Sequence, residues 1–195
     1  MGSSCARESC SEIPLVRRVR ALIPEDLDES FQPVIGAPVT IRPLRPDDLG
    51  IERDFVSGLS DETRYNRLLG GAIKITDEYV RRLTHLDWTR EVALAAITML
   101  GDTETIIGVA RYVIDGSGEA CEFAIVLADA WQGRGVGRRM LLKLVSVARL
   151  RGLKRMYGDI LSTNHAMLGM ARRLGFRIER HAGDPTLARA TLELA

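Results

Sequence analysis

The spacing of hydrophobic and polar positions divides most of the chain into short strands and amphipathic helices. Alternating or short apolar runs predict strands at residues 39–42, 91–99, 106–114, 119–127, 155–161, 176–178 and 186–194. Apolar positions at helical spacing predict helices that begin near residues 46, 60, 76, 138 and 164. Gly101-Asp102 and Asp115-Gly116-Ser117-Gly118 are typical turn sequences, so the three strands between residues 91 and 127 should form an antiparallel meander.

The second half of the chain changes to an alternation of strands and helices. A strand, helix and strand within one sheet need a crossover connection, so part of the sheet should be parallel. The predicted fold class is therefore α/β (α+β), with a mixed central sheet of about six to seven strands flanked by helices. We expect this domain to span residues 39–195.

Residues 1–38 differ from the rest because they are rich in proline and show little strand-like alternation. Within them, apolar residues fall on one face of a helix: Leu15, Val16, Val19, Leu22 and Ile23. We expect a partly disordered leader with a short amphipathic helix, which either packs on the domain or docks a partner.

Composition excludes several classes of protein. The 195 residues carry a formal net charge of +1, which argues against a protein that binds nucleic acid through a broad basic surface. Three cysteines without a CxxC pair and three scattered histidines argue against a disulfide framework and a metal site. The chain has no run of 18 apolar residues and no secretory signal, so we expect a cytoplasmic protein without a membrane partner.

The most informative segment is the glycine-rich stretch 131–139, which follows a predicted strand and opens the longest predicted helix. Its three alternating glycines permit a tight turn, and the first amides of the helix have no intrahelical partner. Strand, turn and helix N-terminus together form an anion site suited to phosphate, to which Arg134, Arg138 and Arg139 add donors. No GK[ST] follows, and Arg138 replaces the last glycine of a dinucleotide fingerprint, so neither of those motifs fits. The alternative is a turn without a ligand.

The segment 132–137, read as Gln-Gly-Arg-Gly-Val-Gly, resembles the Q/R-x-x-G-x-G/A pyrophosphate loop of the GCN5-related N-acetyltransferases (GNAT). Asn164 followed by Leu174-Gly175-Phe176 is similar to the second signature of that family. The resemblance implies the GNAT fold over residues 39–195 and acetyl-CoA, or another acyl-CoA, as a bound co-substrate, with no metal. Its pyrophosphate would lie on Gln132, Gly133, Arg134, Gly135, Val136, Gly137 and Arg138. Its pantetheine would pair with the backbone of Ile125, Val126 and Leu127, close to Asn164.

Residues 82–94, 121–126 and 131–135 also resemble bacterial Pat-type protein lysine acetyltransferases. This finer resemblance implies direct transfer of an acetyl group to a lysine of an AMP-forming acyl-CoA synthetase or of another protein. Many of those relatives carry a further regulatory domain, for which these 195 residues leave no room. A small-molecule amine acetyltransferase and a non-catalytic acyl-CoA-binding sensor stay open as alternatives, as do a monomer and a homodimer.

Attack on a thioester needs a neutral amine, whereas a lysine amine with a pKa of about 10.4 is protonated at neutral pH. A general base is therefore expected, and Glu122 is the candidate, because it lies mid-strand and matches the glutamate of the Pat-type relatives. The alternative is a glutamate on a solvated strand face. Ala171 stands where many GNAT enzymes have a tyrosine acid, so the thiolate leaves unprotonated or takes a proton from water or from Ser162.

Overall fold

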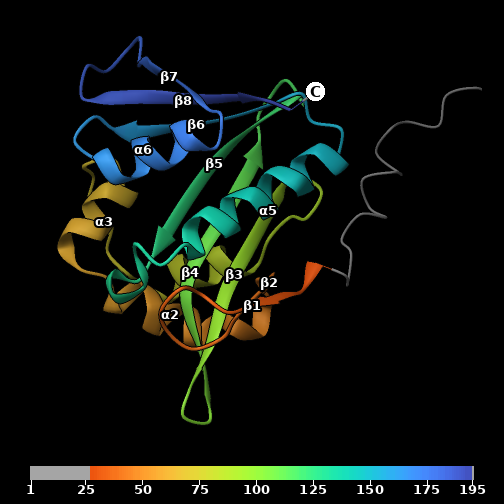
Figure 1. The fold of residues 1–195 in the computed structure, drawn as a ribbon, viewed down its shortest axis with the longest axis vertical. Helices are drawn as coiled ribbons and strands as arrows, with labels where there is room; N and C mark the ends of the chain where they lie inside the picture. The colour runs from red at the N-terminus through yellow and green to blue at the C-terminus, as the bar shows by residue number, and fades with distance from the viewer. Residues whose placement is uncertain (1–26, 195) are drawn as a thin grey trace, which may run out of the picture.

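A computed structural model describes residues 27–194, which form one eight-stranded sheet with helices on both faces (Figure 1). The strands are β1 (Glu29–Phe31), β2 (Val39–Pro43), β3 (Glu91–Leu100), β4 (Thr103–Ile114), β5 (Ala120–Leu127), β6 (Arg155–Leu161), β7 (Arg177–Arg180) and β8 (Leu187–Glu193). The helices are η2 (Pro46–Asp48), α2 (Leu49–Gly58), α3 (Asp61–Arg67), α4 (Asp77–Thr84), η3 (Asp129–Trp131), α5 (Val136–Leu150) and α6 (His165–Arg173).

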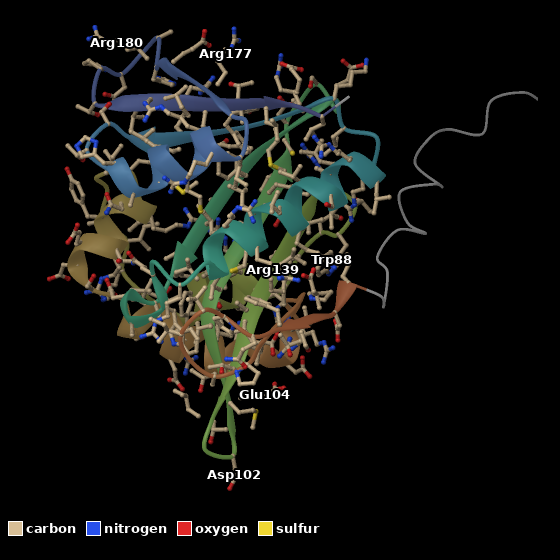
Figure 2. All side chains as sticks on the ribbon, viewed as in Figure 1. Trp88, Asp102, Glu104, Arg139, Arg177 and Arg180 are labelled. Carbon is tan, nitrogen blue, oxygen red and sulfur yellow. The ribbon has the colours of Figure 1, made fainter. Side chains whose placement is uncertain are left out.

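The strand order is β1-β2-β3-β4-β5-β6-β8-β7, and it confirms the predicted mixed sheet. Strands β5 and β6 are parallel, and the other neighbouring strands of the described sheet are antiparallel. The meander β3-β4-β5 is present, and its β3–β4 hairpin projects from the sheet with Asp102 at its tip (Figure 2).

One strand was not predicted. Strand β1 pairs with β2 through Glu29↔Ile41 and Phe31↔Val39. Residues of the expected leader therefore form a strand of the sheet, which has eight strands where about six to seven were expected. The carboxylate of Glu29 accepts a hydrogen bond from Arg139 Nε and lies 3.3 Å from Lys143 Nζ, which ties β1 to α5. The amphipathic helix expected around residues 15–23 lies outside the described residues.

Each face of the sheet has its own core. Helices α5 and α6 cover one face, where Met140, Leu141 and Leu144 are fully buried against β3, β4 and β5. Helix α2 covers the other face, where Phe55 and Leu59 pack on alternate residues of β3 and β4. Successive residues of β5 therefore point to different cores, which matters for the candidate site. No helix within residues 27–194 has the length and hydrophobicity needed to cross a membrane.

Candidate active site

The sheet opens between β5 and β6. Parallel pairing runs from Ala120↔Arg155 to Glu122↔Tyr157, but β5 continues to Leu127 and β6 to Leu161 without further pairing between these two described strands. The two strands diverge beyond that point (Figure 1). The opening leaves one side of β5 without a neighbouring strand, so its backbone is available to a ligand that carries amide groups.

The hydrogen-bond pattern shows which groups of β5 face this opening. Asp115 N donates to Ala120 O and Ala128 N donates to Ile107 O, so even-numbered residues of β5 bond to β4. The backbone groups of Ile125 and Leu127 therefore point toward the opening, as a pantetheine arm requires. Val126 instead turns its backbone to β4 and its side chain to the opposite core.

The glycine-rich loop forms a tight turn at the end of β5 and starts α5. Gly133 and Gly135 have φ angles of 72° and 85°, and Gly135 is the N-cap of the helix. A Cβ on either residue would meet no other atom within 4 Å, so the space in front of the loop is open. Gly137 has a different reason to lack a side chain, because a Cβ there would lie 2.7 Å from Leu127 Cδ1. The loop thus fits a pyrophosphate at a helix N-terminus.

The arginines of this segment are not equivalent. Arg138 is exposed, as a phosphate contact requires. The Arg134 guanidinium lies over the Trp131 ring, 5.2 Å from its centroid, and donates to Ile35 O at 3.4 Å. Arg139 is held by Glu29 and by the Phe31 ring, 4.7 Å away, so the expectation that it contributes to the anion site is not supported.

Gln132 and Asp129 connect the loop to α3. Gln132 Nε2 donates to Thr63 Oγ1 at 3.0 Å and to Leu127 O at 3.3 Å. Asp129 accepts hydrogen bonds from the Ser60 hydroxyl at 2.6 Å and the Thr63 hydroxyl at 2.7 Å, and these hold its pKa down to about 2. Sequence reasoning assigned Gln132 to the cofactor and missed Asp129. In the structure, both side chains fix the loop against the start of α3.

Asn164 caps α6, where its Oδ1 accepts a hydrogen bond from Met167 N at 3.0 Å. The cap fixes the side chain at the end of β6, on the far side of the opening from β5. Ala171 is fully buried in the core beneath α6, so this position offers no acid. Ser162 is exposed just after β6.

Glu122 is exposed at the last paired position before the strands diverge. Its neighbours Cys121 and Phe123 point into the core under α5, so the carboxylate is on the opposite face of β5, with Val126. Its charge acts to raise the pKa of Arg67, Tyr157 and Arg189. Glu122 therefore lies near polar groups of α3, β6 and β8. The carboxylate is therefore accessible beside the opening, as a base must be.

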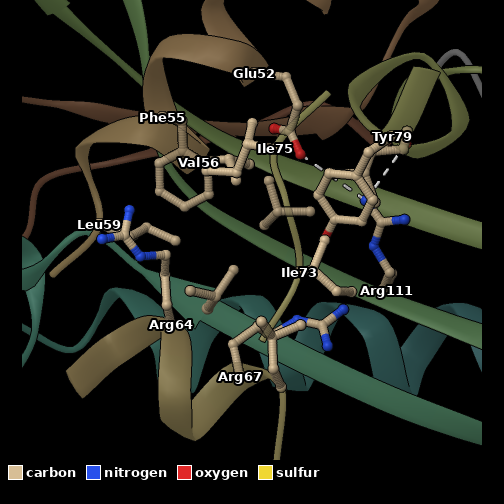
Figure 3. Close-up of a pocket in the computed structure, with 14 residues that line it drawn as sticks. Glu52, Phe55, Val56, Leu59, Arg64, Arg67, Ile73, Ile75, Tyr79 and Arg111 are labelled. Atoms are coloured by element: carbon tan, nitrogen blue, oxygen red, sulfur yellow. Dashed lines mark hydrogen bonds and ion pairs between the residues drawn. The ribbon is translucent and has the colours of Figure 1, made fainter. Parts of the chain in front are cut away.

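On the same face, four polar side chains missed by the sequence reasoning converge on a cavity: Glu52, Arg67, Tyr79 and Arg111 (Figure 3). Glu52 is 1% exposed, and burial raises its pKa to about 7. Burial also lowers the pKa of Arg67 and of Arg111. The available signal was a charged residue in an apolar position: Glu52 shares a helix face with Phe55 and Leu59, and Arg111 interrupts a buried strand.

The comparisons with known proteins agree with this geometry. The model of the acetyltransferase (GNAT) family matches residues 63–176, so the chain belongs to that family. It is an acetyltransferase with the GNAT fold, and its acetyl donor is acetyl-CoA.

Three relatives place the chain within the family. It is 32% identical to Acetyltransferase PA5475 of Pseudomonas aeruginosa over 77% of this chain and 81% of that one. The GNAT domain of S. lividans PAT superposes with a TM-score of 0.78 and 27% identity, over 87% of this chain and 98% of the domain. An L-methionine sulfoximine/L-methionine sulfone acetyltransferase of Pseudomonas aeruginosa is 35% identical, over only 37% of this chain and 45% of that protein.

Proposed function

We propose that the enzyme transfers an acetyl group from acetyl-CoA directly to the side-chain amine of a protein lysine. The observation that carries this proposal is the position of Glu122, exposed at the residue where β5 and β6 separate. A side chain from a second protein can approach an exposed carboxylate without entering the interior. The resemblance of residues 82–94, 121–126 and 131–135 to Pat-type protein lysine acetyltransferases supports the same acceptor class.

In this proposal acetyl-CoA is held mainly by backbone groups, with its pyrophosphate at residues 132–138 and its pantetheine along β5. Ile125 and Leu127 supply the strand contacts, and the free amides that follow Gly135 face the phosphates. Asn164 borders the same opening from the β6 side. Acetyl-CoA supplies a thioester whose carbonyl carbon accepts the amine.

Glu122 takes the proton from the lysine ammonium, and the neutral amine then attacks the thioester carbonyl. A C–N bond forms, the C–S bond breaks, and the electron pair leaves on the sulfur, while the new amide nitrogen loses its remaining extra proton to water. Because Ala171 supplies no acid, the thiolate leaves as an anion or takes a proton from water or from exposed Ser162. Transfer is direct, since buried Cys121, whose thiol pKa is raised to about 12 by burial, is unsuited to form an acyl-enzyme.

A small-molecule amine is the second candidate acceptor. It is favoured by the cavity on the Glu122 face of the sheet, in which Glu52, Arg67 and Arg111 lie, and by the relative named as an L-methionine sulfoximine/L-methionine sulfone acetyltransferase. An AMP-forming acyl-CoA synthetase is the protein acceptor that we propose first. We also propose that the enzyme works in the cytoplasm as a monomer or homodimer.

The test follows free thiol released from acetyl-CoA with three acceptors: a purified AMP-forming acyl-CoA synthetase, L-methionine sulfone and buffer alone. Release above the buffer rate with the synthetase, and acetyl-lysine in its digest, supports the first proposal. Release with L-methionine sulfone alone supports the second candidate. Tight acetyl-CoA binding without release in any arm contradicts both and indicates a sensor.

A further inference from the structure

A cavity of about 40 Å³ lies on the Glu122 face of the sheet, enclosed by α2, α3, α4, β4 and β5. Apolar residues form most of its wall, and Ile73, 47% exposed, lies between the cavity and the surface. Four polar side chains converge inside it, from α2 (Glu52), α3 (Arg67), α4 (Tyr79) and β4 (Arg111). Figure 3 shows Glu52 and Arg111 facing each other, with Tyr79 beside them.

These polar groups are poorly satisfied by one another. Glu52 Oε1 lies 4.0 Å from Arg111, and the buried Oε2 has no hydrogen-bond partner among the described residues. Within residues 27–194, the Arg111 guanidinium donates one long hydrogen bond, 3.4 Å, to Leu83 O, and Arg67 forms no ion pair. Buried charges in this arrangement are costly and call for a further partner.

A buried ion pair elsewhere in the same protein shows the difference. The Arg42 guanidinium makes two hydrogen bonds of 2.7 Å to the Asp48 carboxylate, which also accepts from Arg45 N. That pair is closed and structural, whereas Glu52 and Arg111 are 4.0 Å apart and Glu52 Oε2 accepts no hydrogen bond within residues 27–194. The contrast indicates a binding site and not a framework contact.

The charge balance of the cavity selects the ligand. Two guanidinium groups face one carboxyl, and a third lining arginine, Arg64, is already paired with Asp61 at 2.6 Å. The charged and titratable groups that face Glu52 are Arg111, Arg67, Asp48 and Tyr79. Because burial outweighs the two arginines, the pKa of Glu52 is about 7, and near neutral pH it is partly protonated. A protonated Oε2 is a hydrogen-bond donor. The neutral carboxyl of Glu52 and the two guanidinium groups then all offer donors to an anion.

We infer that this cavity binds a carboxylate group carried by the acceptor, with Arg67, Arg111 and Glu52 as its hydrogen-bonding partners. The inference rests on the proposed acetyl transfer, whose acceptor it describes. The volume corresponds to about three water molecules, which suits the three heavy atoms of a carboxylate. An ammonium group is excluded by the two arginines.

The cavity lies on the path from Glu122. Ala124 pairs with Arg111 across the β4–β5 ladder, and Val126, the next residue on this face, lines the cavity. Glu122 is two residues before Ala124, a separation of about 7 Å along a strand. One acceptor can therefore place its amine at Glu122 and its carboxylate between the arginines.

The binding step is tested without chemistry, by following the Glu52 carboxyl signal in ¹³C NMR with CoA present. Acetate is the probe and acetamide is its neutral isostere. Acetate should shift the signal saturably and raise its titration midpoint by about one pH unit, because a bound anion favours the protonated form. Acetamide should do neither. Equal responses to both probes, or no response to acetate, would overturn the inference.

Variants locate the donors. Arg67→Gln should weaken acetate binding at least about tenfold, the loss of one charge-assisted hydrogen bond. Arg81→Gln is the matched control, because Arg81 is an exposed arginine of α4 outside the cavity lining. The NMR spectrum of each variant checks that it folds. Equal weakening in both variants contradicts a specific site.

The source of the carboxylate is decided with two matched pairs of acceptors. One pair is L-methionine sulfone and its amide, and the other is a lysine peptide with a neighbouring Asp or Asn. Arg67→Gln should raise KM at least about tenfold for the carboxylate member of one pair, with kcat within about twofold and the neutral member unaffected. Acetylation without any such discrimination overturns this inference and leaves the proposed function. Acetate binding without acetylation of any amine overturns the proposed function alone.

Discussion

The two sides of β5 are built by different means. On the opening side, the candidate acetyl-CoA site consists of backbone groups: those of Ile125 and Leu127, on the side of β5 that has no neighbouring strand, and the turn around Gly135. On the Glu122 face, the cavity is lined by side chains from five elements, and its polar groups Glu52 and Arg111 are far apart in the sequence. A site made from one continuous segment is visible in a sequence, whereas a site made from distant side chains depends on packing.

Gly135→Glu should have the largest effect, because it fills the loop with a like charge and forces a side chain onto a φ of 85°. Acetyl-CoA binding, measured by isothermal titration calorimetry, should be abolished. Gly118→Glu is the control, since Gly118 also has positive φ, 71°, and open space, but lies in the β4–β5 turn. Similar affinities in both variants would remove the loop from the acetyl-CoA site.

Glu122→Gln should lower kcat at least about 100-fold near neutral pH and leave acetyl-CoA affinity unchanged. It separates the two sides of β5, because it changes the chemistry without changing the backbone-built site. Glu119→Gln is the control, because Glu119 directly precedes β5 and pairs with Lys154 away from the opening. An unchanged kcat would eliminate Glu122 as the base.

Glu52→Gln tests whether the cavity on the Glu122 face carries a stability cost. The pKa of Glu52 is raised to about 7 from an ordinary value of 4.5, so its ionisation destabilises the fold increasingly as pH rises between these values. The variant lacks this loss, so its melting temperature relative to the native chain should be higher at pH 8 than at pH 5. The corresponding gain in the free energy of unfolding of the variant is at most about 3 kcal/mol. Exposed Glu78→Gln should show no such pH dependence.

Asp129→Asn should have the smallest effect. It weakens the hydrogen bonds from Ser60 and Thr63 that connect the loop to α3, and we expect the Kd of acetyl-CoA to rise about threefold. The pKa of Asp129 is lowered to about 2, so its contribution is lost only as pH falls from about 4 toward 2. The effect should therefore be constant between pH 6 and 9, as measured by calorimetry. Asp102→Asn, at the tip of the β3–β4 hairpin, is the control.

Much of the fold followed from sequence patterns. The antiparallel meander and the change to strand–helix alternation predicted the mixed sheet, because both depend on short-range periodicity. Strand β1 was missed because its three residues are too few to show alternation, and its pairing with β2 depends on tertiary contacts. A parallel part of the sheet was expected, but the early end of the β5–β6 pairing at Glu122 has no local signal.

The candidate site divides in the same way. The glycine loop was read from its own spacing, and the structure gives it open space, although the ligand contacts of residues 132–138 stay predictions. The roles of the arginines could not be read, because Arg134 and Arg139 are held by residues near the N-terminal strand. Arg67 gave no signal, since a basic residue in a short helix looks like any surface residue until α4 covers it.

Strand β1 has a practical consequence for anyone who shortens this chain. A protein trimmed at Val39, where the sequence pattern places the domain start, would keep the loop and both candidate sites. It would also turn β2 into an uncovered outer strand whose Val39 and Ile41 are fully buried in the native fold. Unpaired strand borders of this kind promote self-association. Soluble, monodisperse material for the experiments above should therefore retain Glu29–Phe31.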